Sequence, residues 1–466
     1  MIDQRTTTVA VVAGGLFLAV TSTTVVSVAL PTIGQALHAR PTDLQWIVDA
    51  YVIVYASLLV AGGVLGDRWG RKGLFLIGLV TFGAGSLVSG LAPTVGLLLA
   101  GRVLQGLGPA MVIPGSLTII RATFEDPRRR AAAIGLWSMA SGLALALGPM
   151  LGGVLVEGPG WRWAFLFNVP LTAVLLVLAA RYVPRLARTR AAGRFDWPGL
   201  LLSTAAVAAI SFALIHGQAA GMTSPVVLAT VAAAAAALAA FVGWERRIAE
   251  PLIDVTLFLR PGFAVANAAA LVVFFSFVGA LVYFSAYLQQ VRGHAPIAAG
   301  ADVSAMGAAY AIGAPLSGRL VGRVGPWRPM LAGLVIGGLA TLGLLRLGPQ
   351  TGMSAIWWNF ALVGVGMGLC LTPMTQIAVS AVEASRAGMA SAVHNALRQV
   401  GQVLGVAVLG LLVFAGLPEA SAGGRRLDPS HAALFVRGLH HALWVSGLAL
   451  LAAALATAVA GIKNRA

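Results

Sequence analysis

Four ionisable residues lie inside long apolar stretches of the sequence, where a charge is costly. They are Asp49 in "QWIVDAY", Arg102 in "GRVLQGLGPA", Asp302, and His394 in "HNALRQVGQ". Ionisable groups at membrane depth are rare and usually serve a function. A carboxyl group held between an arginine and apolar surroundings can take up and release a proton. We therefore consider these four residues as candidates for proton coupling, with Asp49 and Arg102 at nearly the same depth.

Each candidate also has a plainer interpretation. Asp49 fits a wetted position near a helix start, beside Trp46, and Arg102 fits a structural arginine bonded to carbonyl groups. His394 and Arg398 are one helical turn apart, so they share a face that either lines a cavity or anchors the helix to a loop. The residues alone leave these alternatives open.

The composition requires lipid as the main solvent. Of the 466 residues, 59% are hydrophobic and 10% are charged, and the mean hydropathy is +0.89. A soluble domain carries about a quarter charged residues. The net charge of +16 does not indicate nucleic acid, because the basic residues recur in short clusters between apolar runs instead of forming one patch. We predict an all-α polytopic membrane protein whose partner is the lipid bilayer, with no nucleic acid.

Apolar runs of about 20 residues, the length that crosses a bilayer core, occur fourteen times. Charges, prolines and glycine clusters separate them. The predicted spans are 9–31, 46–66, 74–92, 95–120, 131–156, 164–183, 197–216, 225–243, 264–290, 299–318, 328–346, 354–381, 388–415 and 434–461.

The charge of the connecting loops predicts the orientation. If the odd-numbered spans start on the cytoplasmic side, twenty-two basic residues lie inside and seven lie outside. Arg102 and Arg398 fall within spans. Cytoplasmic loops are enriched in Lys and Arg. We therefore expect a protein of the cell inner (cytoplasmic) membrane with both termini in the cytoplasm, which agrees with an even number of spans.

One charged segment stands out between the second and third spans. It reads "GVLGDRWGRK" (63–72), where Gly63, Gly66 and Gly70 permit close approach or positive φ. Asp67 is expected to cap a helix N-terminus or to pair with Arg71. We expect the basic residues of this segment to anchor the loop at the cytoplasmic surface of the membrane.

A weaker copy of this segment, "PLSGRLVGR" (315–323), follows the tenth span and has Gly318 opposite Asp67. The offset of eight spans predicts two six-helix halves separated by an extra pair. The expected divisions are residues 1–190, 191–262 and 263–466.

These motifs together resemble the major facilitator superfamily. The 63–72 segment is similar to its signature loop, and "GRVLQGLGPA" (101–110) and "LGPMLGG" (147–153) are similar to its helix-4 motif and to the helix-5 motif of its antiporters. With "WRWAFLFNVP" (161–170), the fourteen spans resemble the drug:proton antiporter branch. The resemblance implies a major-facilitator fold of two six-helix bundles plus two extra central helices.

The resemblance also implies roles for particular residues. The gating loop would clamp the two halves together, with Glu125 and Asp126 as partners of Arg71. Arg102 would set the proton affinity of a nearby carboxylate. The glycines and the proline of the helix-5 motif would seal the protein against leak and mark antiport. The gating residues are Gly63, Asp67, Arg68, Gly70 and Arg71, and those of the antiporter motif are Gly148, Pro149, Gly152 and Gly153.

The sequence departs from the family pattern in the first span. The segment "TSTTVVSVALP" (21–31) has Ser22 where fourteen-helix drug antiporters usually carry an acid. Proton coupling must then pass to another group, and Asp49 is the first choice, followed by Asp302 and His394. The substrate cavity is expected to be lined by aromatic and polar side chains, namely Ser22, Gln105, Trp137, Tyr283, Phe284, Gln376, Asn395 and Arg398.

The sequence favours a proton-coupled exporter of small amphipathic compounds such as drugs or antibiotics. No phosphate-binding G-x-x-x-x-G-K-[ST] motif, metal-ligand spacing or nucleophile–base arrangement is present, so we expect no enzyme activity, no cofactor and no metal. A facilitator or symporter of a neutral or anionic solute is the first alternative, favoured by Ser22. A non-transporting scaffold or sensor is the second. We expect a monomer whose partners are a small-molecule substrate and protons.

Overall fold

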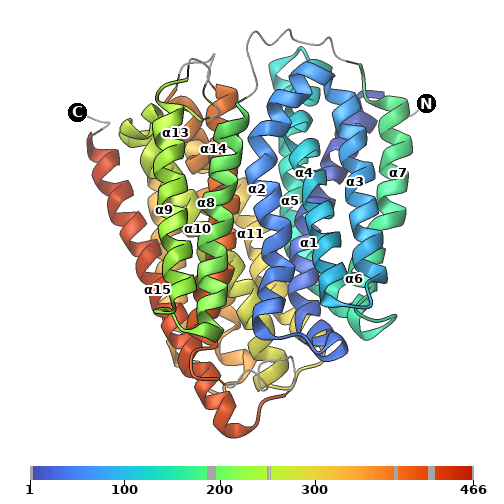
Figure 1. Cartoon of the computed structure of the whole chain (residues 1–466). Helices are drawn as coiled ribbons and strands as arrows, with labels where there is room; N and C mark the ends of the chain where they lie inside the picture. Colours follow the sequence, from blue (N-terminus) through green and yellow to red (C-terminus); the bar gives the residue numbers. More distant parts are fainter. Residues whose placement is uncertain are drawn as a thin grey trace.

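The computed structural model describes residues 4–185, 196–248, 251, 253–382, 387–417 and 426–463, which form a bundle of long helices (Figure 1). The α-helices are α1 (Gln4–Leu37), α2 (Pro41–Trp69), α3 (Arg71–Leu91), α4 (Val95–Thr123), α5 (Pro127–Glu157), α6 (Trp163–Leu166), α7 (Asn168–Tyr182), α8 (Trp197–Ala220), α9 (Pro225–Glu245), α10 (Pro261–Ala286), α11 (Pro296–Val324), α12 (Trp327–Gly343), α13 (Trp357–Ser380), α14 (Ala387–Val413) and α15 (Pro429–Lys463).

Short helical segments complete the described chain: η1 (Val255–Leu259), the π-helical η2 (Tyr287–Val291) that continues α10, η3 (Leu344–Arg346) and η4 (Met353–Ala355). Within the described residues, thirteen helical segments are long and apolar enough to cross a membrane, with α6 and α7 counted as one. Helix α2 has 29 residues and runs beside them as a fourteenth (Figure 1). The fourteen predicted spans each correspond to one of these helices.

Two groups of helices lie side by side. Helices α1 to α7 form one side of the molecule and α10 to α15 the other, and both chain ends lie at the same end of the molecule (Figure 1). We call this end the terminal face and the opposite end the far face. Helix α8 packs against both α2 and α14, and α9 packs against α8. The two additional helices therefore lie along the α2–α14 seam.

Local sequence sets several helix starts. Proline occupies the first turn of α8, α9, α10 and α11, where its missing N–H costs nothing. The side chains of Thr94, Asp196 and Ser224 accept hydrogen bonds from the first turns of α4, α8 and α9. These starts place the polar residues described below at defined depths along each helix.

The 63–72 segment is more helical than expected. Asp67 lies within the last turns of α2, so it does not cap α3, whose N-cap is Gly70. Of the three glycines, only Gly70 has a positive φ, at 99°, because the chain turns there. The side chains of Asp67 and Arg68 lie outside what the structure describes.

The second copy of this segment is also helical. Helix α11 runs through it to Val324 and ends before Gly325, whose φ is 77°. When the two turn glycines are matched, Gly322 lies opposite Asp67 in place of the expected Gly318. The repeat is therefore a helix end followed by a glycine turn, not a loop.

Helices α5 and α11 make the closest backbone contact between the two groups. A Cβ on Gly300 would lie 2.2 Å from the Pro149 carbonyl oxygen, and one on Gly307 would lie 2.1 Å from that of Leu145. Pro149 has no N–H, so Leu145 lacks its usual helical hydrogen-bond donor. The Gly307 backbone packs directly against this carbonyl. Met150 N donates to Ser304 Oγ at 3.0 Å, which ties the two helices in their far-face halves.

The glycines of "LGPMLGG" divide between two neighbouring helices. Gly148 and Gly152 pack against Thr24 and Val25 of α1, within the same group of helices. Gly153 lies against the backbone of Pro296 and Ile297 at the start of α11. The motif thus allows α5 to lie close to α1 and to α11 at once.

The α8–α9 hairpin contains two buried carboxyl groups. Asp196 is 4% exposed and accepts hydrogen bonds from Gly199 N at 2.9 Å and Trp244 Nε1 at 2.7 Å. Glu245 is 3% exposed and accepts one from Ile253 N at 3.2 Å. Both carboxyl groups lie where the chain enters α8 and leaves α9, and the neighbouring backbone and the Trp244 ring cover them.

Candidate functional site

Arg102 is fully buried among α1, α2 and α4. Its Nε donates to the Ile47 carbonyl at 2.7 Å, and its Nη1 contacts Ser22 Oγ at 3.1 Å and Gln105 Oε1 at 2.6 Å. Its Cζ lies 4.3 Å from the centroid of the Tyr51 ring. Ser22 therefore contacts the arginine from the position where an acid was expected by family resemblance.

Hydrogen bonds extend this cluster through α3. Gln105 Nε2 donates to Ser86 Oγ at 2.7 Å, and the Tyr51 hydroxyl donates to the Ala19 carbonyl at 2.8 Å. These contacts tie α1, α2, α3 and α4 together. Ser22 and Gln105 are fully buried here, so in this structure they are part of the packing around Arg102.

Asp49 does not meet Arg102, although the two lie at similar depth. Successive residues of an α-helix are rotated by about 100°, so Asp49 points away from the α2 face that carries Ile47 and Tyr51. Tyr283 of α10 lies within electrostatic reach of Asp49, across the boundary between the two groups of helices. Asp49 is 0% exposed, and neither carboxyl oxygen has a hydrogen-bond partner among the described residues.

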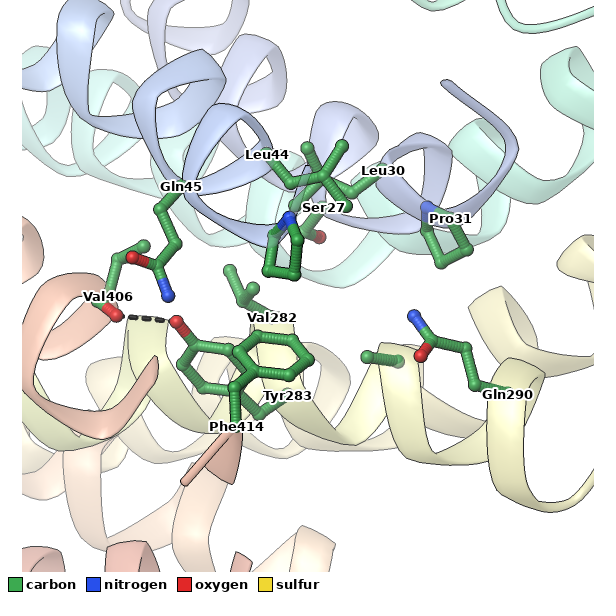
Figure 2. A pocket seen from close by; sticks show the side chains of 12 residues that line it. Ser27, Leu30, Pro31, Leu44, Gln45, Val282, Tyr283, Gln290, Val406 and Phe414 are labelled. Carbon is green, nitrogen blue, oxygen red and sulfur yellow. Dashed lines mark hydrogen bonds between the residues drawn. The ribbon is translucent and has the colours of Figure 1, made fainter. Parts of the chain in front are cut away.

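A small cavity lies between Asp49 and the far face (Figure 2). It measures about 20 Å³, enough for one water, and is bordered by α1, α2, α10, η2 and α14. Gln45, one turn before Asp49, points to the Tyr283 hydroxyl, which donates to the Val406 carbonyl (Figure 2). Gln290, 2% exposed, projects into the same cavity from η2. Polar groups of both helix groups therefore meet directly on the far-face side of Asp49.

Arg398 occupies a second cluster, near the middle of the bundle. Its Cζ lies 4.2 Å from the centroid of Phe274, and its Nη1 donates to Asn395 Oδ1 at 3.0 Å. The guanidinium also lies within electrostatic reach of the hydroxyls of Tyr55 on α2 and Tyr310 on α11. Its Nε has no hydrogen-bond partner among the described residues.

The other two candidates for proton coupling already have partners. Asp302 lies at the start of α11 with its Oδ2 3.1 Å from His294 Nδ1, partly exposed towards the far face. His394 is fully buried between α10 and α13, with Nδ1 3.1 Å from Asn267 Oδ1 and Nε2 3.2 Å from Thr375 Oγ1. His394 is therefore part of the packing within one group of helices.

Three of the expected cavity residues have surroundings of their own. Phe284 follows Tyr283 but points about 100° away, where it packs on Phe360 with ring centroids 4.6 Å apart. Gln376 is exposed on α13, and Trp137 is partly exposed on α5. The grouping of these three residues with Arg398 stays a prediction.

The gating segment can be described in part. The side chain of Arg71 folds back over Gly66, where a Cβ would lie 3.0 Å from Arg71 Cδ. Asp126 lies 3.9 Å from Arg129 in an exposed ion pair, and Glu125 is exposed beside it. The expected pairing of Arg71 with these acids stays a prediction.

Sequence reasoning missed the tyrosines that connect the two arginines. Tyr51 packs on Arg102, Tyr55 approaches Arg398, and their rings lie 6.1 Å apart. It also missed Gln45, which shares its face with Asp49. The spacing of four residues in both pairs, within one span, was the available signal.

Relatives of known name are similar over most of the chain. The multidrug resistance protein Stp of Mycobacterium tuberculosis is 40% identical over 405 residues, which cover 86% of this chain and 75% of that protein. The tetracenomycin C resistance and export protein of Streptomyces glaucescens is 34% identical over 432 residues, covering 91% and 80%. The methylenomycin A resistance protein of Streptomyces coelicolor is 34% identical over 401 residues, covering 86% and 84%.

Solved structures share the fold at low sequence identity. A bacterial homologue of the human lysosomal transporter Spinster, in its inward-facing and unoccupied conformation, gives a TM-score of 0.70 at 18% identity, with 99% of this chain and 97% of that chain covered. The nucleoside transporter NupG gives 0.67 at 10% identity, covering 98% and 100%. Residues 12–406 match the Major Facilitator Superfamily. With the bundle of membrane helices and the similarity to the resistance proteins, this match establishes that the chain belongs to that superfamily.

Proposed function

We propose that this protein is a proton-coupled exporter of small amphipathic compounds such as drugs or antibiotics. Relatives at 33–40% identity are named as resistance, export or efflux proteins, and "LGPMLGG" is the helix-5 pattern that resembles antiporters. The function is transport and not enzymatic catalysis. The protein acts as a monomer in the cytoplasmic membrane, with the terminal face towards the cytoplasm, where most of its basic loop residues then lie.

The burial of Asp49 without a hydrogen-bond partner is the observation that supports the proton-coupling part of this proposal. A carboxyl group without a hydrogen-bond partner is costly inside an apolar bundle when it is charged. In this proposal Asp49 is therefore the group that takes up the proton. Its place beside Tyr283, at the boundary between the two halves, lets a relative movement of the halves change its hydration. The cavity between Gln45 and Gln290 provides a position for water on the far-face side.

The two other motif assignments complete the mechanism. The gating segment with Asp67 and Arg71 clamps the halves together on the cytoplasmic side when the far face is open. The α5–α11 glycine contact closes the far face in the alternate state, and Gly300 and Gly307 permit that close approach. Alternation between the two closures exchanges a proton at Asp49 for a substrate molecule.

Transport into everted membrane vesicles tests this proposal. A panel of puromycin, tetracenomycin C and methylenomycin A supplies substrates suggested by the names of the relatives. We expect uptake that requires a proton gradient with the vesicle interior acidic, and that stops when an uncoupler is added. Asp49→Asn should abolish the dependence on pH, whereas Asp43→Asn on the exposed first turn of the same helix should retain it. Wild-type pH dependence in Asp49→Asn would assign coupling to a different group.

A facilitator or symporter of a neutral or anionic solute is the second candidate, and Ser22 favours it. The usual helix-1 acid is absent, and Ser22 is instead bonded to Arg102. A facilitator predicts uptake that follows the substrate's own gradient and survives the uncoupler. The same vesicles therefore separate the two functions.

A further inference from the structure

Arg398 lies at the boundary between the two halves of the protein, near the middle of the membrane. Tyr55, Phe274 and Tyr310 all lie near the midpoints of their helices, α2, α10 and α11, and surround the arginine of α14. Substrate sites of transporters with repeated halves lie near the bilayer midplane, between the halves. The position of Arg398 is therefore suitable for contact with a transported molecule.

The arginine has hydrogen-bond donors to spare. A guanidinium carries five N–H groups, and its packing on Phe274 leaves the edge of the group free to make hydrogen bonds in its own plane. Nη1 donates to Asn395 at 3.0 Å, while Nε is buried without a partner. A planar, two-oxygen acceptor such as a carboxylate matches this fork of donors.

The charge of Arg398 is also uncompensated. Among the described residues, the ionisable groups within its electrostatic reach are the hydroxyls of Tyr55 and Tyr310 and the ring of His394, and none of them is a carboxylate. Asp49 is not among these neighbours, and Asp302 contacts His294 near the far face. An isolated cation at this depth is costly, so a bound anion is stabilised here.

We propose that Arg398 holds the anionic group of the substrate and that the preferred substrates are aromatic carboxylates or phenolates. Tyr55 and Tyr310 donate hydrogen bonds to the same group from α2 and α11, while Phe274 supplies an apolar surface for the aromatic body. The substrate then bridges both halves of the protein and can bias their relative movement. This inference rests on the proposed transport function and specifies the charge of its substrate.

Equilibrium binding of two matched dyes tests the proposal. Fluorescein is an aromatic anion, and the methyl ester of the corresponding rhodamine is a cation with the same ring system. Purified protein in lipid nanodiscs, followed by fluorescence anisotropy, should bind fluorescein at least about 10-fold more tightly. Arg398→Gln should weaken fluorescein binding by about 10- to 100-fold, the effect of one or more charged hydrogen bonds, without weakening that of the rhodamine ester.

Arg346 provides a matched control. It too lies over an aromatic ring, Trp358, and donates to an asparagine, Asn359, but at the far-face end of α12. Arg346→Gln should retain fluorescein affinity. Arg398→Lys, which keeps the charge but loses the fork, should give an intermediate affinity and serves if Arg398→Gln does not fold.

Two results would overturn the inference: tighter binding of the rhodamine ester to the wild type, or unchanged fluorescein affinity in folded Arg398→Gln. Binding at equilibrium needs no proton gradient. Anion binding without proton-driven uptake would therefore refute only the proposed transport function. Proton-driven uptake of the cation without fluorescein binding would refute only the anion site.

Discussion

Arg102 and Arg398 are both arginines at membrane depth, one in each half of the protein, but their surroundings differ. Arg102 is fully buried, and its contacts come from α1, α2 and α4 of the same half. Arg398 is partly exposed, has one hydrogen-bonded neighbour on its own helix, and faces tyrosines of α2 and α11. The first arginine holds one half together, and the second faces residues of the other half.

Burial of a charge therefore does not by itself mark a transport site. Hydrogen bonds to carbonyl and hydroxyl oxygens, together with the Tyr51 ring, stabilise the charge of Arg102. Arg398 lacks such a set and is the better binding group for that reason. The two arginines should therefore respond to mutation through different quantities, stability for Arg102 and substrate affinity for Arg398.

Removal of Arg102 should have the largest effect on stability. Arg102→Leu leaves the Ile47 carbonyl and Gln105 without their donor, and charged hydrogen bonds contribute about 1.5–3 kcal/mol each. We expect a loss of about 3–5 kcal/mol of unfolding free energy, read as a lower melting temperature in detergent. Arg398→Leu should change it by less than about 1 kcal/mol. Equal losses of unfolding free energy in the two variants would show that Arg102 and Arg398 contribute alike to stability.

Of the two arginines, only Arg398 should have its surroundings disturbed by separation of the two halves. Gly307→Val forces a side chain against the Leu145 carbonyl, an overpacking that costs about 1–3 kcal/mol. Spin labels at Glu157→Cys and Ile297→Cys, in a Cys370→Ser background, should move apart by several ångströms in pulsed electron paramagnetic resonance. Gly318→Val, where nothing lies within 4 Å, is the control. An unchanged label distance in Gly307→Val would show that the contact does not hold the far face closed.

The same substitution one helical turn apart should have two different effects. Tyr51→Phe loses the buried hydrogen bond to Ala19, so we expect about 0.5–1.5 kcal/mol lower stability and unchanged dye binding. Tyr55→Phe should retain stability and weaken fluorescein binding by about 2- to 10-fold. Melting temperatures and dye anisotropy measured on both variants distinguish the two roles. The reverse assignment of effects would contradict the division between the clusters.

An acid introduced in the first span should have the smallest effect on stability. Ser22→Asp places a carboxylate beside Arg102, where a serine oxygen now lies at 3.1 Å. Because the gain in charge pairing is offset by desolvation, we expect unfolding free energy within about 1 kcal/mol of wild type. Fluorescein binding at Arg398 should persist, with Ser22→Asn as the uncharged control. Loss of dye binding in Ser22→Asp alone would mean that the two arginines share one site.

The sequence predicted the helices well because lipid imposes one simple rule, a long apolar run for each crossing. It also predicted the depth of Asp49 and Arg102 from their distance to the span ends. It did not predict the directions in which their side chains point, because two residues such as Ile47 and Asp49 differ by about 200° around the helix. The direction of a side chain in the bundle depends on which helix packs against each surface, and that information lies in other segments of the sequence.

The contacts of side chains near the predicted loops were also hard to anticipate. Asp67 looked like a loop residue because charges and glycines surround it, yet α2 continues through it. Asp196 and Glu245 flank charged segments of the sequence, yet Trp244 and Gly199 enclose them. In each case the local composition described the segment correctly but carried no information on the tertiary contact.

The attachment of α8 along one seam makes the two lateral sides of the protein unequal. Phe212 of α8 lies 6.4 Å from Trp46 of α2, and α8 also contacts α14, so this seam is covered. The opposite seam, between α5 and α11, presents exposed apolar side chains such as Leu143, Leu147 and Ile312. A lipophilic molecule dissolved in the bilayer therefore meets a further pair of helices at one seam and the two halves themselves at the other.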